Sequence, residues 1–370
     1  MKILLIGNYP PDRQESMLRY ASVLRDGLAG TGHEVRVAAP RARLDHAARG
    51  ASGVWKWAGY VDKLVLAPGE IRRAARWADV VHVCDHSNAT YVPRHRQRPW
   101  IVTCHDLLAL RGALGEETDC PASPTGRALQ RMILAGLRRA DAYVADSGAT
   151  LDDVARVVAR PGVPAEVIPP PLNYPFRRLP SGECDARLAG CASLGTEPYL
   201  LMVGSNLRRK NRALGVRLLA RLRDRWRGRL VFAGEAPDEA LWREIDALGV
   251  ADRVVALTRP SGELLEALYN RAFALLFPSR FEGYGWPLIE AQACGCPVIA
   301  STAPPHPEVT GGAALLCRLD AEAEFDDAVL ALASDRALRD SLVTRGLANA
   351  ARFDVESFAA RVSALYESVA

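Results

Sequence analysis

The chain alternates short, continuous apolar runs with amphipathic helical patterns, and it does so in two successive series along its 370 residues. The apolar runs fall at 2–7, 35–38, 80–83, 100–103 and 142–145, and then at 199–203, 230–233, 254–256, 273–277 and 297–300. Strands that are apolar at every position are buried on both faces, which is typical of parallel sheets covered by helices. The sequence therefore predicts an α/β protein with two doubly wound parallel sheets.

A proline-rich segment separates the two series. Residues 169–171 are consecutive prolines, and Pro175 and Pro180 follow them. Prolines at this density interrupt regular structure. We expect a Rossmann-like domain over 1–170, an irregular linker over 171–198, a second Rossmann-like domain over 199–350 and a helix over 351–370 that packs back toward the first domain. In such folds ligands bind at the carboxyl ends of the strands, here in a cleft that the two domains face.

Composition narrows the class of protein. The formal net charge is only +4 and no block of like charge occurs, so no nucleic-acid partner is expected. The apolar run at 2–7 is too short for a signal peptide or a membrane span, which predicts a cytoplasmic protein. Eight cysteines without a C-x-x-C pair indicate reduced, mostly buried thiols and no structural zinc.

Two arginine-rich segments leave open whether the protein contacts the inner face of a membrane. The helical pattern over 211–229 has an apolar face flanked by arginines, which are Leu214, Leu218, Leu222 and Trp226 beside Arg217, Arg221 and Arg225. An interfacial helix has this composition, but a core-packed helix with an Arg-rich solvent face is the preferred interpretation. The second segment contains Arg94, Arg96 and Arg98.

The most specific segment is 277–291, FPSRFEGYGWPLIEA, which follows an apolar strand and leads into a helix. Gly283 and Gly285 favour a tight turn with exposed backbone N–H groups, and Pro287 fits the first turn of the helix. Such a helix N-terminus is an anion site. Glu282 and Glu290 flank it, and carboxylates accept hydrogen bonds from hydroxyl groups. The arrangement suits a nucleotide sugar, with its pyrophosphate between the ribose and the hexose.

The two glutamates eight positions apart, in FEGYGWPLIEA, resemble the signature of the retaining family-four glycosyltransferases of the GT-B fold. The resemblance extends through 294–301, 307–316 and 203–211, and more loosely through the first half of the chain. It implies that Glu290 binds the nucleotide ribose and that Glu282 faces the sugar hydroxyls. It also implies that Lys210 neutralises the departing diphosphate. The expected donor-binding residues are Gly204, Ser205, Asn206, Arg209, Lys210, Glu282, Gly283, Tyr284, Gly285, Trp286 and Glu290.

Other positions depart from the family pattern or stay open. Ser205 stands where the family commonly has a phosphate-binding arginine, and Arg209 is a candidate substitute. Arg208 and Arg212 are interpreted as a solvated basic face. In the first domain His105 ends a strand, and position and resemblance together favour a contact with the donor sugar. The catalytic set is thus His105, Lys210 and Glu282, with His82 and His86 as weaker candidates.

The loop 8–16 lacks the glycines that the family usually has there. Asp12 and Glu15 form a capping pattern for a helix over 13–29, which leaves Arg13 and Gln14 to reach toward acceptor or phosphate. Because no D-x-D triplet occurs, no metal is expected, and the nucleotide sugar is a co-substrate without a separate cofactor.

The expected reaction is retaining transfer of a hexose to an unidentified acceptor, with attack on the face that the diphosphate leaves. This mechanism is implied by the resemblance, and Glu282 as a covalent nucleophile is the less favoured route. Two alternatives remain at this point: a nucleotide-sugar epimerase or sugar phosphorylase on the same fold, and a protein that binds a nucleotide sugar without turnover.

Overall fold

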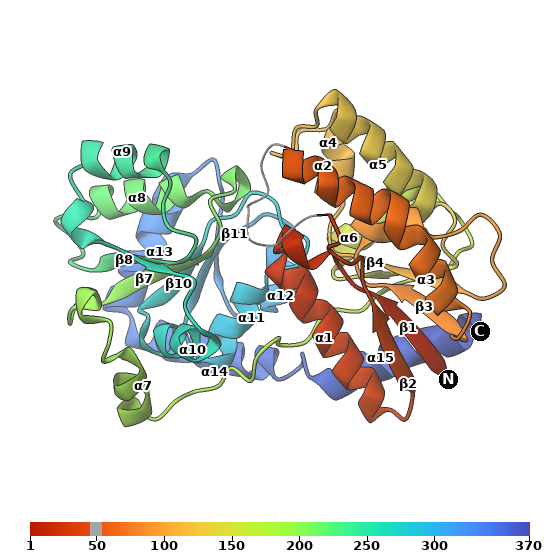
Figure 1. Cartoon of the computed structure of the whole chain (residues 1–370). Helices are drawn as coiled ribbons and strands as arrows, with labels where there is room; N and C mark the ends of the chain where they lie inside the picture. Colours follow the sequence, from red (N-terminus) through yellow and green to blue (C-terminus); the bar gives the residue numbers. More distant parts are fainter. Residues whose placement is uncertain (45–53) are drawn as a thin grey trace. The chain divides into compact units, whose positions relative to one another are not determined.

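The structure is a computed structural model that describes residues 1–44 and 54–370 (Figure 1). The chain forms two compact units, and the first of them is built from two separate segments. Unit 1 comprises Met1–Asn173 together with Phe353–Ala370, and unit 2 comprises Tyr174–Arg352. Each unit contains one six-stranded sheet in which every pair of neighbouring strands is parallel.

The sheet of unit 1 has the strand order β2-β1-β3-β4-β5-β6. The strands are β1 (Lys2–Ile6), β2 (Glu34–Ala38), β3 (Val80–Val83), β4 (Trp100–Cys104), β5 (Ala142–Ala145) and β6 (Ala165–Val167). The central strands β3, β4 and β5 are buried at every position, as expected for a sheet covered on both faces.

The helices of unit 1 connect these strands or return from the end of the chain. They are α1 (Glu15–Gly30), α2 (Val54–Val61), α3 (Ala67–Ala75), α4 (Leu108–Ala113), α5 (Pro124–Leu137), α6 (Gly148–Asp153) and α15 (Val355–Val369). Short turns η1 (Pro10–Asp12) and η3 (His86–Tyr91) and π-helical segments η2 (Asp62–Leu66) and η4 (Val154–Val158) complete the unit. Figure 1 shows α15 alongside α1. The two helices pack closely at Gly27 of α1, where an added Cβ would lie 3.1 Å from side-chain atoms of Val355 and Ala359 on α15.

The sheet of unit 2 has the order β12-β11-β10-β7-β8-β9. Its strands are β7 (Tyr199–Gly204), β8 (Arg229–Gly234), β9 (Val254–Thr258), β10 (Ala274–Phe277), β11 (Val298–Ser301) and β12 (Leu315–Cys317). The helices are α7 (Ser181–Leu188), α8 (Arg212–Arg221), α9 (Glu239–Ala247), α10 (Gly262–Arg271), α11 (Trp286–Ala293), α12 (His306–Thr310), α13 (Glu322–Ser334) and α14 (Arg336–Ala350). The 3-10 turns are η5 (Ala192–Leu194), η6 (Arg208–Lys210) and η7 (Ala251–Arg253).

The expectation of two doubly wound parallel sheets is confirmed, and the differences are local. Helix α7 lies within the segment that the prolines predicted to be irregular. The three-residue edge strands β6 and β12 were not predicted, because so few residues give no periodicity to detect.

The capping prediction for the first helix is wrong. Helix α1 begins at Glu15 with Gln14 as its N-cap, and no side chain caps it. Asp12 lies in η1 instead and pairs with Lys63, with 2.8 Å between Oδ2 and Nζ. The prolines at positions 10 and 11 direct the chain into a 3-10 turn before the helix can start, since proline fixes φ near the helical value.

Helix α8 packs into the core of unit 2, which confirms the preferred interpretation of its pattern. Leu214 and Leu218 are fully buried, and Leu222 and Trp226 beyond the helix end are nearly so. On its flank Arg221 pairs with Asp326 of α13 at 2.7 Å, and Arg217 pairs with Glu322 of the same helix. Across 1–44 and 54–370, no helix is long and apolar enough to cross a membrane.

Candidate functional site

The predicted donor-binding residues of unit 2 lie at the carboxyl ends of its central strands. Strand β7 ends at Gly204 and is followed by the turn η6, which contains Arg209 and Lys210. The neighbouring strand β10 ends at Phe277 and continues into the loop that carries Glu282. Carboxyl ends of adjacent parallel strands meet at one edge of the sheet, so two segments about 70 residues apart converge there.

A buried carboxylate between two cations forms the centre of this edge. Glu282 Oε1 accepts a hydrogen bond from Lys210 Nζ at 2.6 Å, and its Oε2 accepts one from Arg209 Nη1 at 2.6 Å. The Glu282 side chain is only 6% exposed. Arg209 also donates to the carbonyl of Phe281 at 2.9 Å, and its own carbonyl accepts from the Arg280 N–H at 2.7 Å. Lys210 Nζ lies 5.2 Å from the centre of the Phe277 ring. Lys210, Arg209 and Glu282 are thus brought together as the sequence predicted.

The cluster fixes the charge of Glu282. Burial opposes ionisation of this carboxyl, but the charges of Lys210 and Arg209 overcome it and lower the pKa of Glu282 to about 2. His306 of α12 lies in the same neighbourhood, and burial lowers its pKa to about 4, so it is neutral near pH 7. Glu282 is therefore an acceptor of hydrogen bonds and not a proton donor.

The N-terminus of α11 has the turn that the sequence predicted. Gly285 is its N-cap with φ +104°, and a Cβ there would lie 3.1 Å from Leu288 Cδ1. A side chain at this position would be both strained and crowded. Further into the helix Glu290 is buried, and its Oε2 accepts a hydrogen bond from the Tyr269 hydroxyl at 2.8 Å. That bond holds the Glu290 carboxylate on the α10 side of the helix.

Arg212 holds the loop after β7 in place, whereas the sequence pattern predicted that it lies on a solvated face. Arg212 is buried, and its Nη1 donates to Asn206 Oδ1 at 2.7 Å and to the Glu235 carbonyl at 2.9 Å. The solvated-face interpretation therefore holds for exposed Arg208 but is wrong for Arg212. The Asn206 backbone N–H donates to Glu235 Oε2 at 2.8 Å, which fixes the loop containing Ser205 from both sides.

In unit 1, His105 follows β4 and is enclosed by protein groups. Its Nδ1 is hydrogen-bonded to Asp146 Oδ2 at 2.7 Å, and its Nε2 is hydrogen-bonded to the Cys84 carbonyl at 2.8 Å. Both partners are acceptors, so both ring nitrogens donate, which is the imidazolium form. Burial opposes that form, but the carboxylate of Asp146 outweighs it and raises the pKa of His105 to about 9. The Tyr20 ring packs edge-on at 4.5 Å between centroids.

A second polar network occupies the same edge of unit 1. Buried Asn8, directly after β1, donates from Nδ2 to Asp85 Oδ2 and to Gln14 Oε1, each at 2.5 Å. Gln14 is thus anchored to the strand end, whereas its neighbour Arg13 is exposed with φ +50°. The two weaker candidates also contact polar groups of the protein. His86 Nδ1 lies 3.3 Å from Asp85 Oδ1, and His82 Nε2 is hydrogen-bonded to Thr103 Oγ1 at 2.7 Å.

Sequence reasoning missed the partners that position the predicted residues. Asp146 is the first residue after β5, Asp85 is the second residue after β3, and Tyr269 lies near the end of α10 next to Glu290. The two aspartates had a signal, because each is a carboxylate placed within two residues of the end of a buried strand. Tyr269 had none, since its contact depends on how α10 and α11 pack. Within 1–44 and 54–370, no group of three or more His, Cys, Asp or Glu side chains is arranged to hold a metal ion.

Comparison with solved structures identifies the class of fold. Sucrose-phosphate synthase from Thermosynechococcus elongatus superposes with a TM-score of 0.77 at 22% identity, covering 100% of this chain and 98% of that one. HepE from Anabaena in complex with UDP-glucose gives a TM-score of 0.75 at 17% identity over the full length of both chains. Two Rossmann-like sheets with polar residues at their carboxyl edges define the GT-B class of glycosyltransferase folds.

Sequence comparison identifies the family. Residues 17–174 match the family described as Glycosyltransferase Family 4, and residues 197–335 match the one described as Glycosyl transferases group 1. D-inositol 3-phosphate glycosyltransferase from Nocardia farcinica is 30% identical over 81% of this chain and 68% of that protein. Three other curated relatives are matched over 44% to 63% of their own length. The chain belongs to the family-four glycosyltransferases, and the matches give no support to an epimerase or a phosphorylase.

The structure predicts that Asp146 sustains the charge on His105. Replacement by Asn removes the adjacent anion, so Asp146→Asn should lower the pKa of His105 by about 1 to 3 pH units. Because the folded-state pKa is raised, this interaction stabilises the protein fully below about pH 6.5 and is lost as the pH rises through about 9. NMR titration of the histidine ring, assigned with His105→Gln, measures the shift. Asp106→Asn is the matched control, and an equal shift in both variants would contradict the assignment.

Proposed function

We propose that this glycosyltransferase moves a hexose from a nucleoside diphosphate sugar to an acceptor with retention of anomeric configuration and without a metal ion. The observation that carries the proposal is the Lys210–Glu282–Arg209 cluster at the carboxyl edge of the unit 2 sheet. Two cations at such an edge, beside the N-terminus of α11, suit a diphosphate. The buried carboxylate of Glu282 pairs with both of them when no ligand is bound.

Donor binding then adds a second anion to the two cations. The diphosphate joins Glu282 as a partner of Lys210 and Arg209, which are already held at this edge by Phe277 and by the carbonyl of Phe281. Guanidinium and ammonium groups bind phosphate oxygens through charge-assisted hydrogen bonds. As the bond to the sugar breaks, negative charge grows on the leaving diphosphate, and Lys210 stabilises it most at that stage.

Glu282 and Glu290 bind hydroxyl groups on the two sides of the diphosphate. With a pKa of about 2, Glu282 stays ionised and accepts hydrogen bonds from the sugar hydroxyls. Glu290, oriented by Tyr269, accepts hydrogen bonds from the ribose hydroxyls in the same way. These roles follow the family resemblance, and the geometry of both carboxylates is compatible with them.

Retention is proposed to proceed by attack on the face that the diphosphate leaves, with a phosphate oxygen accepting the acceptor's proton. A carboxylate held by two cations is a weak nucleophile, because its negative charge is already engaged. That argues against a covalent intermediate on Glu282. His105 is proposed to contact the donor sugar through Nε2, with the sugar replacing the Cys84 carbonyl as its partner while Asp146 holds Nδ1 in place. Arg13, exposed at the turn before α1, is the proposed contact for acceptor or phosphate.

The first prediction of this proposal tests whether Lys210 contacts the diphosphate directly or only adds to the general positive charge of its segment. Lys210→Ala should lower kcat by a factor on the order of 10²–10³, as does loss of a donor that stabilises charge in the transition state. Glu282 keeps Arg209 as its partner in this variant, so the buried carboxylate is not left alone. Arg208→Ala removes the same charge from an exposed position two residues away and should cost less than about tenfold. Equal losses in steady-state kinetics would show that Lys210 is not a positioned ligand.

The second prediction concerns the nucleotide. Glu290→Ala should weaken binding of the nucleoside diphosphate by about 1–3 kcal/mol, because hydrogen bonds to a charged acceptor are lost. Calorimetry with UDP, GDP, ADP and TDP, in wild type and variant, measures the affinity and identifies the base. Since Glu290→Ala leaves the Tyr269 hydroxyl buried, Glu290→Ala/Tyr269→Phe serves as the control for local disturbance. Affinity that is unchanged in both variants would remove Glu290 from the nucleotide site.

The third prediction is that turnover survives chelation. The chain has no D-x-D triplet, and the basic residues supply the charge that a metal supplies elsewhere. Activity in excess EDTA should therefore equal activity in added magnesium or manganese. The same assay, followed by NMR of the product's anomeric proton, reports retention or inversion. Activity that is abolished by EDTA and restored by either metal would overturn the metal-independent mechanism.

A further inference from the structure

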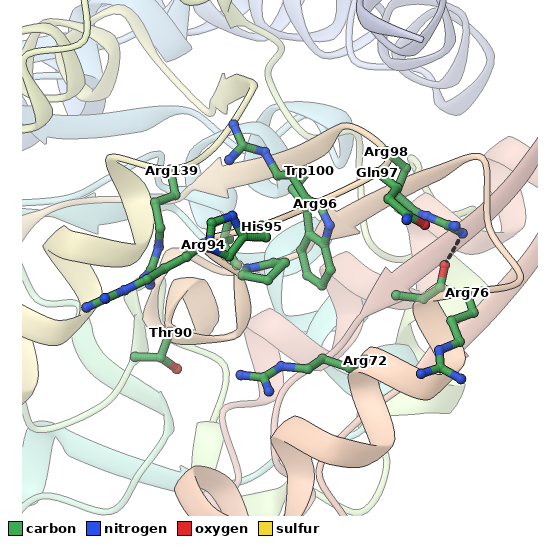
Figure 2. A pocket seen from close by; sticks show the side chains of 13 residues that line it. Arg72, Arg76, Thr90, Arg94, His95, Arg96, Gln97, Arg98, Trp100 and Arg139 are labelled. Carbon is green, nitrogen blue, oxygen red and sulfur yellow. Dashed lines mark hydrogen bonds between the residues drawn. The ribbon is translucent and has the colours of Figure 1, made fainter.

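A hollow of about 620 Å³ lies in unit 1 at the edge of the sheet opposite to His105 (Figure 2). Trp100, the first residue of β4, lines it, and so do residues near the end of α3 and just after α5. These segments precede strands β3, β4 and β5, so they sit at the amino ends of the strands. His105, Asp146 and Asp85 follow strands and sit at the carboxyl ends. The hollow is therefore separate from the residues discussed above.

Among the residues that the structure describes, the hollow is lined by six arginines and one histidine and by no acidic residue. The arginines come from three elements, which are α3, the segment before β4 and the end of α5: Arg72, Arg76, Arg94, Arg96, Arg98 and Arg139. Figure 2 shows Arg94 and Arg139 together at one side and Arg72 reaching toward them from α3. Guanidinium groups do not deprotonate under ordinary conditions, so this lining is permanently positive.

Only part of this charge is balanced by the protein. Arg96 pairs with Asp141, with 2.7 Å between Nε and Oδ2. Arg98 donates to the carbonyl of Ala75, the last residue of α3, and to the carbonyl of Ala78 in the segment that follows. Within the part of the chain that the structure describes, no carboxylate pairs with Arg72, Arg76, Arg94 or Arg139. Four guanidinium groups thus face one hollow without an anion.

Arg139 shows the electrostatic cost of this arrangement. Its Nε is buried and has no hydrogen-bond partner among the residues of 1–44 and 54–370. Burial lowers the pKa of Arg139, and repulsion from Arg94 and Arg96 lowers it further. An anion in the hollow would offset both effects, because it supplies the missing acceptor and the missing charge.

Compensation of helix dipoles does not explain the whole cluster. Arginines near the ends of α3 and α5 do stabilise the negative ends of these helices. Arg94 and Arg98, however, belong to the segment before β4, and Arg98 already binds the carbonyl of the last residue of α3. Arg72, Arg76 and Arg94 are exposed to solvent, but together with Arg139 they line a concave surface rather than a flat one.

We propose that this hollow is a second ligand site, which binds a phosphorylated group carrying two or more phosphoryl units. Guanidinium groups bind phosphate oxygens in pairs of parallel hydrogen bonds, and three converging elements can contact more than one phosphoryl unit at once. The volume lies within the range of small-molecule sites. Val92, Pro93 and Trp100 add an apolar wall that can contact the remainder of such a ligand.

The test compares two double variants, and the two arginines lost in one are sequence neighbours of the two lost in the other. One pair lines the hollow, and the other lies outside it. Arg72→Gln/Arg139→Gln removes two arginines from the hollow, and Arg73→Gln/Arg138→Gln removes their exposed neighbours outside its lining. Calorimetry with inorganic pyrophosphate should show at least a tenfold loss of affinity in the first pair and less than a twofold change in the second. Binding of pyrophosphate at Lys210 is common to all three proteins and cancels in the comparison.

A second arm distinguishes a soluble ligand from a lipid headgroup, which share the same phosphoryl chemistry. Co-sedimentation is measured with vesicles of phosphatidylcholine alone and with vesicles that also contain cardiolipin, whose headgroup carries two phosphodiester groups. Loss of binding to the anionic vesicles in the first pair but not in the second assigns the hollow to lipid headgroups. A difference with pyrophosphate alone assigns it to a soluble ligand. If neither probe separates the two pairs, or if wild type binds neither probe, the proposal is overturned.

Discussion

The placement of one buried carboxylate determines much of the chemistry that unit 2 can perform. Glu282 is nearly inaccessible to water and yet ionised, because Lys210 and Arg209 hold it from two directions. A buried charge without partners would cost several kcal/mol, so the turn η6 and the loop after β10 depend on each other for their positions. The same balance keeps two cations fixed at a strand edge in the absence of ligand, which reduces the reorganisation needed when an anionic substrate arrives.

Unit 1 also contains a buried charge that is stabilised by its partners, but here the buried group is a cation. There a buried cation, His105, is held by the carboxylate of Asp146 and the carbonyl of Cys84. Next to it His82 is neutral, since burial and the charge of His105 lower its pKa to about 3. Two histidines on or next to neighbouring strands therefore have opposite protonation states near pH 7. The difference comes mainly from Asp146, with further contributions from Asp85 and the Cys84 carbonyl.

The sequence predicted what depends on repeated local pattern and missed what depends on packing between distant elements. Buried strands such as β4 and β5, and the turn at Gly285 before α11, follow from apolar runs and from glycine and proline placement. That Lys210 and Glu282 share one site was predictable because both residues follow adjacent strands, whereas their direct ion pair was not predicted. Arg212 was misassigned because its neighbours in sequence are basic and its partners, Asn206 and the carbonyl of Glu235, come from a loop and another strand. Helix α7 was missed because prolines on both sides of it dominated the local signal.

The path of the chain makes unit 1 dependent on its own distant end. Helix α15 is separated from the rest of unit 1 by all of unit 2, and it brings Tyr366 to the buried ring of His82, with 2.5 Å between the hydroxyl and Nδ1. Phe358 of the same helix packs against Tyr20. During synthesis the first 173 residues therefore emerge without the helix that covers this part of their core. The core of unit 1 can therefore be completed only after α15 has been synthesised, which is after all of unit 2.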